Sequence, residues 1–318
     1  MAESRSLNHR ANELYQSAVA VQDVLRLVHT RLDRTEILDF GVNSTGGLAA
    51  GLHLAEMCMA GLGTVRLQAA GPTIDLPQVF VNTDHPLQAC LLSQYAGWKI
   101  ATDDFFAMGS GPMRATAASE TLFEEFPVRE DRTCCVGVLE AGSLPTPSAI
   151  DRMLDQVGDV AQLSIAVAPT ASQAGNVQVV ARSVETAMHK LHELNFPVAT
   201  VISGTGAAPL PPVAKNDLAG IGRTNDAILY GSVVNLWVEC EDQQIQEVGA
   251  DTPSCASTSH GRPFLELYKE ANHDFYALDK ALFSPAVVVF HNLRTGNTFQ
   301  YGKLMPNLLN KSFGIQNT

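Results

Sequence analysis

Apolar positions that recur every three or four residues predict helices along much of the chain. The first predicted helix covers 3–33, where residues such as Leu7, Ala11 and Leu14 follow helical spacing. Ser44-Thr45 is a candidate cap for the second, which Gly61 would end. The predicted helices are 3–33, 48–60, one starting near 86, 110–125, 147–157 and 172–194.

Short runs of Val, Ile and aromatic residues predict strands between these helices. Leu163, Ile165 and Val167 alternate with smaller residues, as is typical of a strand. A strand over 198–202 is expected to end in the loop SGTGAAPLPP, and Arg294-Thr295-Gly296-Asn297 is a hairpin-turn signal. The predicted strand regions are 65–67, 79–81, 133–139, 163–168, 198–202, 227–239 and 287–301.

Helices and strands alternate irregularly, which predicts a mixed α/β (α+β) protein. The length of 318 residues fits two domains or one large one. We find no internal repeat and no Pro/Gly/Ser-rich linker. Candidate internal boundaries within the 1–318 unit are the loops 69–78, 140–148 and 203–222.

Charge and composition narrow the function classes. The chain has 21 Lys+Arg against 33 Asp+Glu, a net charge of −12, which argues against a nucleic-acid-binding protein. The longest strongly apolar run is near 285–290, too short to cross a membrane. The six cysteines form no C-x-x-C pair and the N-terminus has no apolar signal stretch, so we expect a cytoplasmic protein with reduced thiols.

The segment Met108–Ala115 combines glycines with the start of a predicted helix. Gly109 and Gly111 would let the backbone approach a ligand closely, Ser110 lies between them, and Arg114 could donate two parallel hydrogen bonds. The alternative is a tight turn followed by an ordinary helix, since short glycine motifs are weak signals.

The helix predicted over 172–194 carries a polar stripe opposite its apolar face. Gln178, Arg182, Glu185, His189 and His192 recur at spacings of four, three, four and three. One interpretation is a solvated face with a weak ion pair. The other is a stripe along a cleft, with a carboxylate as base and a guanidinium that orients the substrate. The two histidines lack a third ligand, so no metal site is predicted.

Three later segments are rich in polar or aromatic residues. Thr224, Asn225 and Asp226 are expected at the start of a strand, where they could form a turn or recognise the edge of a heterocycle. The loop 253–263, with Ser257, Ser259 and His260, is either a flexible connector or a hydrogen-bonding cradle. The aromatic residues of 275–286 are expected to pack in the core.

The motif Ser203-Gly204-Thr205-Gly206 lacks the third glycine and the helix of a dinucleotide fingerprint.

Taken together, these segments resemble the methenyltetrahydromethanopterin cyclohydrolase family. The resemblance spans the chain, and its order and spacing fit throughout. The segments are Gln94–Trp98, Gly109–Ala115, Ala168–Ser172, Ala181–Thr186, His189–Glu193, Gly222–Gly231, Pro253–Pro263 and Phe275–Ala286. The chain departs from the family pattern at Met113, at Cys255-Ala256 and at Lys280.

The resemblance implies a cytoplasmic homotrimer of one-carbon metabolism, with two α/β domains and a substrate cleft between them. It implies interconversion of 5,10-methenyl- and 5-formyl-tetrahydromethanopterin by addition or removal of water, without metal or redox cofactor. The family's catalytic Glu and Arg match Glu185 and Arg182. The expected substrate-binding residues are Gly109, Ser110, Gly111, Arg114, Thr224, Asn225, Asp226, Ser257, Ser259 and His260.

Three other functions remain open from the sequence. The chain could be a pterin-binding relative without turnover, a cyclohydrolase that acts on the folate analogue, or a scaffold protein. Turnover assays with both carriers separate the first two, and only a binder gains stability from its ligand.

Overall fold

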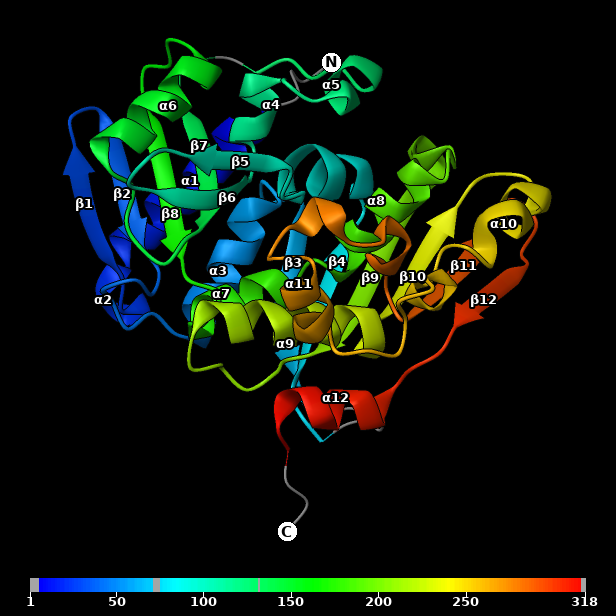
Figure 1. Cartoon of the computed structure of the whole chain (residues 1–318). Coiled ribbons are helices and arrows are strands. Elements are labelled where there is room, and N and C mark those ends of the chain that lie inside the picture. Colours follow the sequence, from blue (N-terminus) through cyan, green and yellow to red (C-terminus); the bar gives the residue numbers. More distant parts are fainter. Residues whose placement is uncertain (1–5, 71–74, 131, 316–318) are drawn as a thin grey trace. The chain divides into compact units, whose positions relative to one another are not determined.

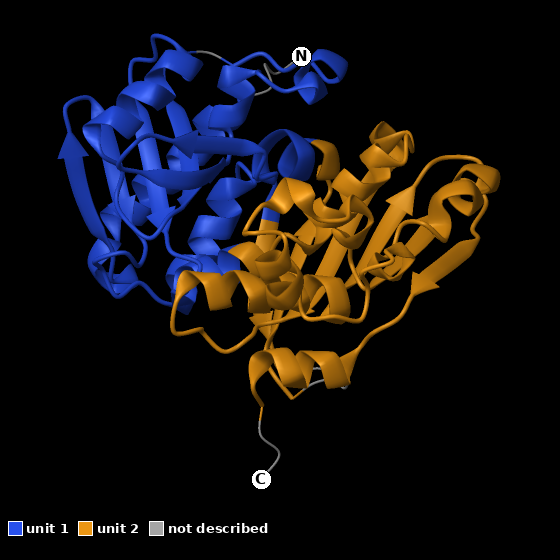
Figure 2. Ribbon diagram, in the orientation of Figure 1, with its two compact units in different colours: residues 1–63, 88–178 blue, residues 64–87, 179–318 orange. Residues whose placement is uncertain are grey.

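The protein divides into two compact units, coloured separately in Figure 2. The computed structural model describes residues 6–70, 75–130 and 132–315. Unit 1 consists of residues 1–63 and 88–178, and unit 2 of residues 64–87 and 179–318. The chain therefore passes from one unit to the other three times.

The three candidate boundary loops lie away from these passages. The loop 140–148 belongs to unit 1, and 203–222 belongs to unit 2. The loop 69–78 falls in the unit 2 part of the chain, and its residues 71–74 lie outside the described residues.

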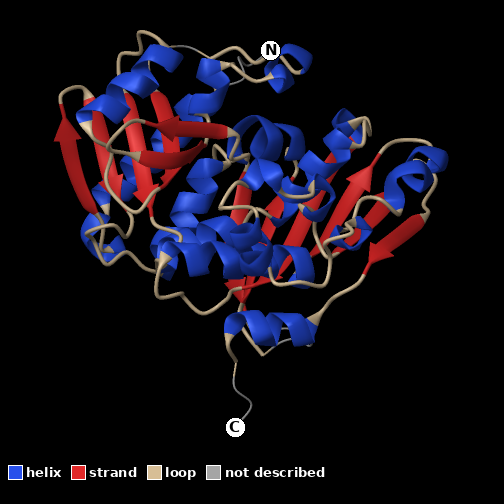
Figure 3. Ribbon diagram, viewed as in Figure 1, coloured by secondary structure: helices blue, strands red, loops and turns tan. Residues whose placement is uncertain are grey.

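Unit 1 is built on a six-stranded sheet in the order β1-β2-β8-β7-β6-β5 (Figure 1, Figure 3). β8 pairs in parallel with both β2 and β7, and the outer pairs are antiparallel. Its elements are α1 (Leu7–Ala20), α2 (Gln22–Leu25), β1 (Val28–Leu32), β2 (Thr35–Asp39), α3 (Leu48–Cys58), η1 (Leu87–Gln94, a π-helix), β5 (Trp98–Ala101), β6 (Phe106–Ser110), α4 (Met113–Ala117), α5 (Thr121–Glu125), β7 (Cys135–Glu140), α6 (Pro147–Val157), β8 (Leu163–Ala168) and α7 (Gln173–Val180).

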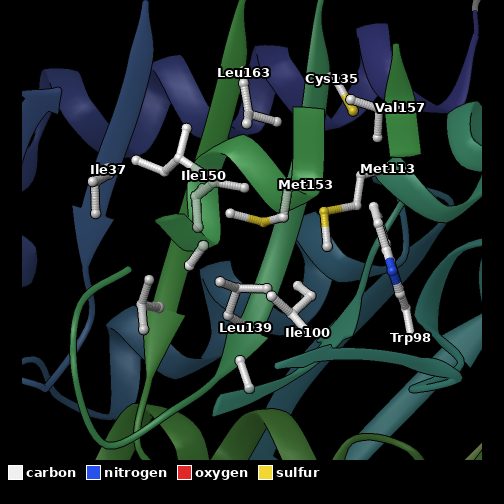
Figure 4. Close-up of a cluster of buried hydrophobic side chains, with 14 of the residues drawn as sticks. Ile37, Trp98, Ile100, Met113, Cys135, Leu139, Ile150, Met153, Val157 and Leu163 are labelled. Carbon is white, nitrogen blue, oxygen red and sulfur yellow. The ribbon is translucent and has the colours of Figure 1, made fainter. Parts of the chain in front are cut away.

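Each face of this sheet has its own apolar core. The alternation of β8 sends Leu163, Ile165 and Val167 toward α6, where Met153 and Trp98 are also buried (Figure 4). The other face of the sheet, including Ala166, packs against α1 and α3. Because successive strand side chains point to opposite faces, this pattern confirms the strand predicted from the alternation.

Unit 2 is built on a second six-stranded sheet, in the order β12-β11-β10-β9-β4-β3. β10 and β11 are parallel, whereas β9 is antiparallel to both β10 and β4. Its elements are β3 (Gly63–Gln68), β4 (Gln78–Thr83), α8 (Ser183–Glu193), η2 (Val198–Thr200), β9 (Val201–Pro209), α9 (Asp217–Gly231), β10 (Val233–Val238), α10 (Asp242–Gly249), η3 (Ser254–Ala256), α11 (Phe264–Glu270), η4 (Phe275–Ala277), η5 (Lys280–Leu282), β11 (Val287–Asn292), β12 (Thr298–Gly302) and α12 (Pro306–Phe313).

Several sequence predictions are confirmed. Thr146 caps α6 through its side chain, with Pro147 at the first helical position. α3 lies within the predicted 48–60 helix, and β11 and β12 pair across the predicted turn. The fold class, mixed α/β, is also confirmed.

Other predictions are wrong because backbone breaks interrupt a continuing apolar pattern. The 3–33 helix ends at Ala20, a short α2 follows, and Arg26 (φ 57°) turns the chain into β1; residues 3–5 lie outside the described part. The 110–125 helix is two short helices, α4 and α5, separated at Ala118 (φ 45°).

Three local assignments also change. Gly47, not Ser44-Thr45, is the cap of α3, because Ser44 bonds to Asp39 instead. The segment expected as the loop SGTGAAPLPP is largely strand β9, because its backbone pairs with β4 and β10 on both sides. The predicted strand region 227–239 is helical up to Gly231, and β10 follows.

Candidate active site

The helix predicted over 172–194 is interrupted at the residues of greatest chemical interest. α7 ends at Val180, α8 starts at Ser183, and Arg182 occupies the N-cap position of α8. The backbone N–H of Arg182 donates to the Val179 carbonyl (3.1 Å). Its carbonyl accepts from both the backbone N–H and the hydroxyl of Thr186 (2.8 Å each). The main chain at Arg182 is therefore held from both sides.

Glu185 lies in the first turn of α8, close in sequence to Arg182. A negative charge is favoured there, because the free N–H groups of the first turn carry partial positive charge. Arg182 is 5% exposed and Glu185 6%. The interpretation of this stripe as a solvated face is therefore wrong: both charged groups are buried.

Two glycines of β9 let α8 approach the sheet of unit 2 closely. A Cβ at Gly206 would lie 2.2 Å from Ser183 Oγ, and a Cβ at Gly204 would lie 2.9 Å from a methyl group of Val184. Both distances are too short for real atoms, so a larger residue would force Ser183 or Val184, in the first turn of α8, to shift. The glycines that resembled an incomplete dinucleotide fingerprint thus allow the turn that carries Glu185 to pack closely on β9.

The loop 253–263 is an ordered hydrogen-bonded structure, not a flexible connector. Ser254 Oγ donates to the Leu229 carbonyl (2.5 Å). Ser257 Oγ donates to Asp279 Oδ2 (2.6 Å) and accepts from the backbone N–H of Ser259 (3.1 Å). The flexible-connector interpretation is therefore wrong, and a cradle for a ligand stays a prediction.

His260 closes this loop against α9. Its Nδ1 lies 3.5 Å from Ser254 Oγ, and its ring centroid is 5.1 Å from that of Tyr230. Since the Ser254 hydroxyl hydrogen points at Leu229, the hydroxyl oxygen is left to accept from Nδ1–H. Burial, followed by the charge of Lys303, lowers the pKa of His260 below its ordinary value. The imidazole is therefore neutral near pH 7.

Thr224, Asn225 and Asp226 lie inside α9, so their predicted place at a strand start is wrong. Thr224 Oγ1 bonds to the Gly220 carbonyl (2.9 Å) and Asn225 Nδ2 to the Ile221 carbonyl (2.9 Å). Both interactions are side-chain-to-backbone bonds within one helix.

Asp226 is fully buried and uses both carboxyl oxygens within unit 2. It accepts from the backbone N–H of Phe264 at the start of α11 (2.8 Å) and from Ser312 Oγ of α12 (2.5 Å). Burial raises the pKa of Asp226 to about 7. Asp226 thus ties α9 to two other helices.

The segment Gly109–Arg114 in unit 1 is a tightly packed corner. Gly111 has φ +87°, which favours glycine, and its N–H bonds to the Ser93 carbonyl (2.9 Å). Ser110 is buried and donates to the Val138 carbonyl (3.1 Å). A Cβ at Gly109 would lie 3.0 Å from both the Met113 methyl carbon and the Trp98 carbonyl oxygen. Backbone conformation accounts for Gly111, and close packing accounts for Gly109.

Arg114 is 1% exposed and is bound within unit 1. Its Nε and Nη2 donate to the two carboxylate oxygens of Glu120 (2.8 and 2.6 Å), and Nη1 donates to the Leu91 carbonyl (3.0 Å). The guanidinium also lies over the rings of Tyr95 and Phe123. The fork expected to hold a ligand is occupied by Glu120.

The sequence did not indicate a role for Asp279, which binds the Ser257 loop, or for Lys190, a buried residue of α8. Asp279 accepts from Ser257, and Lys190 of α8 is only 5% exposed. No spacing signal marks them, because Asp279 lies among aromatic residues assigned to the core and Lys190 falls outside the polar stripe. Among the described residues, no three His, Cys, Asp or Glu side chains form a group that could hold a metal ion, and no helix is both long and apolar enough to cross a membrane.

Comparison with known proteins defines the class. The family described as "Cyclohydrolase (MCH)" matches residues 6–313, so the chain belongs to this cyclohydrolase family. A methenyltetrahydromethanopterin cyclohydrolase of Rhodopirellula baltica is 44% identical, covering 98% of this chain and 95% of the relative. Proteins of the same name from Methylobacterium sp. (strain 4-46) and Methanocorpusculum labreanum are 42% and 39% identical. They cover 97% and 98% of this chain and 97% and 99% of their own lengths. The resemblance seen in the sequence is confirmed.

Proposed function

We propose that this protein interconverts 5,10-methenyl- and 5-formyl-tetrahydromethanopterin. One observation carries the proposal: a member of the cyclohydrolase family buries an arginine and a glutamate together at the start of α8. The relatives named above bear the name of this activity over nearly their whole length.

The substrate supplies its own electrophile. The methenyl carbon lies between two nitrogens that share a positive charge, so water can attack it without a Lewis acid. We accordingly propose that the reaction uses no metal or redox cofactor. Glu185 is the general base that takes one proton from the attacking water, and Arg182 orients the carboxylate or the water.

The tetrahedral intermediate then collapses to the formyl product. The bond between the former methenyl carbon and N10 breaks, and Glu185 returns its proton to N10. The hydroxyl oxygen becomes the formyl carbonyl, and its proton leaves to solvent. One water is consumed and one proton is released, which balances the loss of the positive charge.

The expected substrate-binding residues fall into two groups, those that we propose to contact substrate and those that support the surrounding structure. We propose that Ser257, Ser259 and His260 line the substrate site, because the loop orders their polar groups next to α9. Asn225, which is half-buried, could reach the pterin edge. Gly109, Ser110, Gly111, Arg114, Thr224 and Asp226 are engaged within their own units, and we assign them a supporting role.

The decisive experiment follows the loss of the amidinium chromophore. Purified protein is mixed with methenyltetrahydromethanopterin or with methenyltetrahydrofolate, and Glu185→Gln is assayed in parallel. We expect turnover of the first carrier and a fall in kcat of at least about 10²-fold in the variant. No turnover of either carrier would exclude the proposed reaction, and near-normal kcat in the variant would remove Glu185 from its role.

We also propose that the protein is a cytoplasmic homotrimer. Light scattering on the purified protein measures its mass, for comparison with a chain of 34.1 kDa. A monomer at micromolar concentration would contradict the trimer.

A further inference from the structure

Asp279 connects the turn η5 to the loop that contains Ser257, and the sequence did not indicate this link. It caps the 3₁₀ turn η5, where Oδ1 accepts from the backbone N–H of Ala281 (3.0 Å). Its Oδ2 accepts from Ser257 Oγ (2.6 Å). One carboxylate therefore holds both its own turn and the serine loop.

The hydrogen bond to Asp279 also orders the loop beyond Ser257. With its hydrogen directed at Asp279, the Ser257 hydroxyl turns a lone pair to the backbone N–H of Ser259 (3.1 Å). Ser257 is 6% exposed, so water competes poorly for this chain of bonds. The backbone position of Ser259 thus depends on Asp279 through one hydroxyl.

The charge of Lys190, on α8, also acts on this carboxylate. The hydrogen bond from Ser257 is the largest cause that lowers the pKa of Asp279, and the charge of Lys190 lowers it further. Lys190 lies one helical turn and one residue beyond Glu185 and is 95% buried.

We propose that Asp279 is a positioning residue for the reaction: by binding Ser257 while it caps η5, it fixes the Ser257–His260 loop that we propose lines the substrate site. The proposal rests on the proposed function, because that function gives the loop a substrate to hold. Asp279 itself touches no reacting atom.

The test is the variant Asp279→Asn, which keeps the size of the side chain and removes its charge. We expect KM to rise about tenfold with kcat changed less than about twofold, because loop order affects binding more than the chemical step.

The chain offers a matched control in Asp274. It caps the neighbouring 3₁₀ turn η4 by accepting from the backbone N–H of Tyr276 (2.9 Å), as Asp279 does for η5. Asp274→Asn therefore makes the same chemical change at an equivalent turn that no serine hydroxyl in this loop contacts. We expect its KM to equal that of wild type.

A second measurement does not depend on turnover. Amide hydrogen exchange of the peptide 254–262 should quicken in Asp279→Asn and stay unchanged in Asp274→Asn. Equal KM and equal exchange in the two variants would overturn the positioning role. If wild type fails to turn over methenyltetrahydromethanopterin, the proposed function fails, and the exchange comparison still decides whether Asp279 orders the loop. Should Asp279→Asn not fold, Ser257→Ala removes the same hydrogen bond and is expected to show the same faster exchange.

Discussion

Strand β6 in unit 1 and strand β9 in unit 2 both use a glycine to let a neighbouring element pack closely. The neighbouring elements differ in the role that we propose for them. In β6, Gly109 makes room for the apolar side chain of Met113 and the backbone of Trp98. In β9, Gly206 makes room for Ser183, the first residue of the helix that carries Glu185. The sequence pattern of the first suggested a ligand cradle more strongly, yet the second positions the residue that we propose as the catalytic base. A glycine motif is therefore best interpreted by what packs on it.

The largest expected effect is the difference in kcat between variants of Glu185 and Glu120. Glu185→Gln should lower kcat by about 10²–10⁴-fold, because a general base is lost. Glu120→Gln, in which the bond partner of Arg114 loses its charge, should leave kcat near wild type and lower the melting temperature instead. Steady-state kinetics and thermal unfolding of both variants check this, and a kcat loss in Glu120→Gln would place the unit 1 corner in the chemistry.

The next effect concerns Arg114 itself. Its guanidinium is fully buried while Glu120 is 23% exposed, so Arg114→Met leaves a partly solvated carboxylate without its partner. We expect a loss of about 3 kcal/mol in the free energy of unfolding, the lower end of what removing one member of a buried pair costs. Denaturant titration measures it. A loss below about 1 kcal/mol would show that the corner does not depend on this ion pair.

A smaller effect is expected when alanine replaces a glycine in β9 or in β6. Gly206→Ala should destabilise the protein by roughly 1–3 kcal/mol and also lower kcat about tenfold, because the first turn of α8 must move. Gly109→Ala would meet the Met113 methyl carbon and the Trp98 carbonyl oxygen, both within unit 1, and should lower stability alone. Steady-state kinetics at a temperature where both variants are folded tests this difference. Equal kcat values in the two variants would mean that the packing of α8 on β9 does not affect catalysis.

The last comparison concerns the pH dependence contributed by Asp226. Its folded-state pKa, about 7, exceeds the ordinary value of 3.8, so the unfolded state loses the proton first as pH rises. Asp226 therefore favours the folded state most at low pH, and its contribution declines from about pH 4 to pH 7. Asp226→Asn can keep both hydrogen bonds without a charge, so its melting temperature relative to wild type should increase over this range. An unchanged difference would contradict the buried titration.

Periodicity predicted the regular elements well and the breaks between them poorly. The alternation in β8 and the cap and proline of α6 are local signals, and both were confirmed. The interruption at Arg182 could not be predicted, because apolar spacing continues from Val180 through Val184 without a glycine or proline. The Thr224–Asp226 segment was likewise assigned to the start of a strand, whereas it lies inside α9.

The candidate site shows a similar division. The family motifs identified Arg182 and Glu185, and burial then distinguished a buried charged pair from a solvated face. The engagement of Arg114 by Glu120 could not be foreseen, since it depends on the left-handed turn at Ala118. Asp279 was missed because its partner Ser257 lies 22 positions away in the chain.

The sheet order of unit 2 has a consequence for synthesis on the ribosome. β4 ends at Thr83, but its partner β9 starts only at Val201, after the whole second segment of unit 1 has emerged. At about 5–20 residues per second, β4 waits roughly 6–24 s for that neighbour. For that interval a strand edge of the nascent chain is open to other chains, so slower translation or crowded polysomes should increase aggregation of this protein before any finished molecule exists.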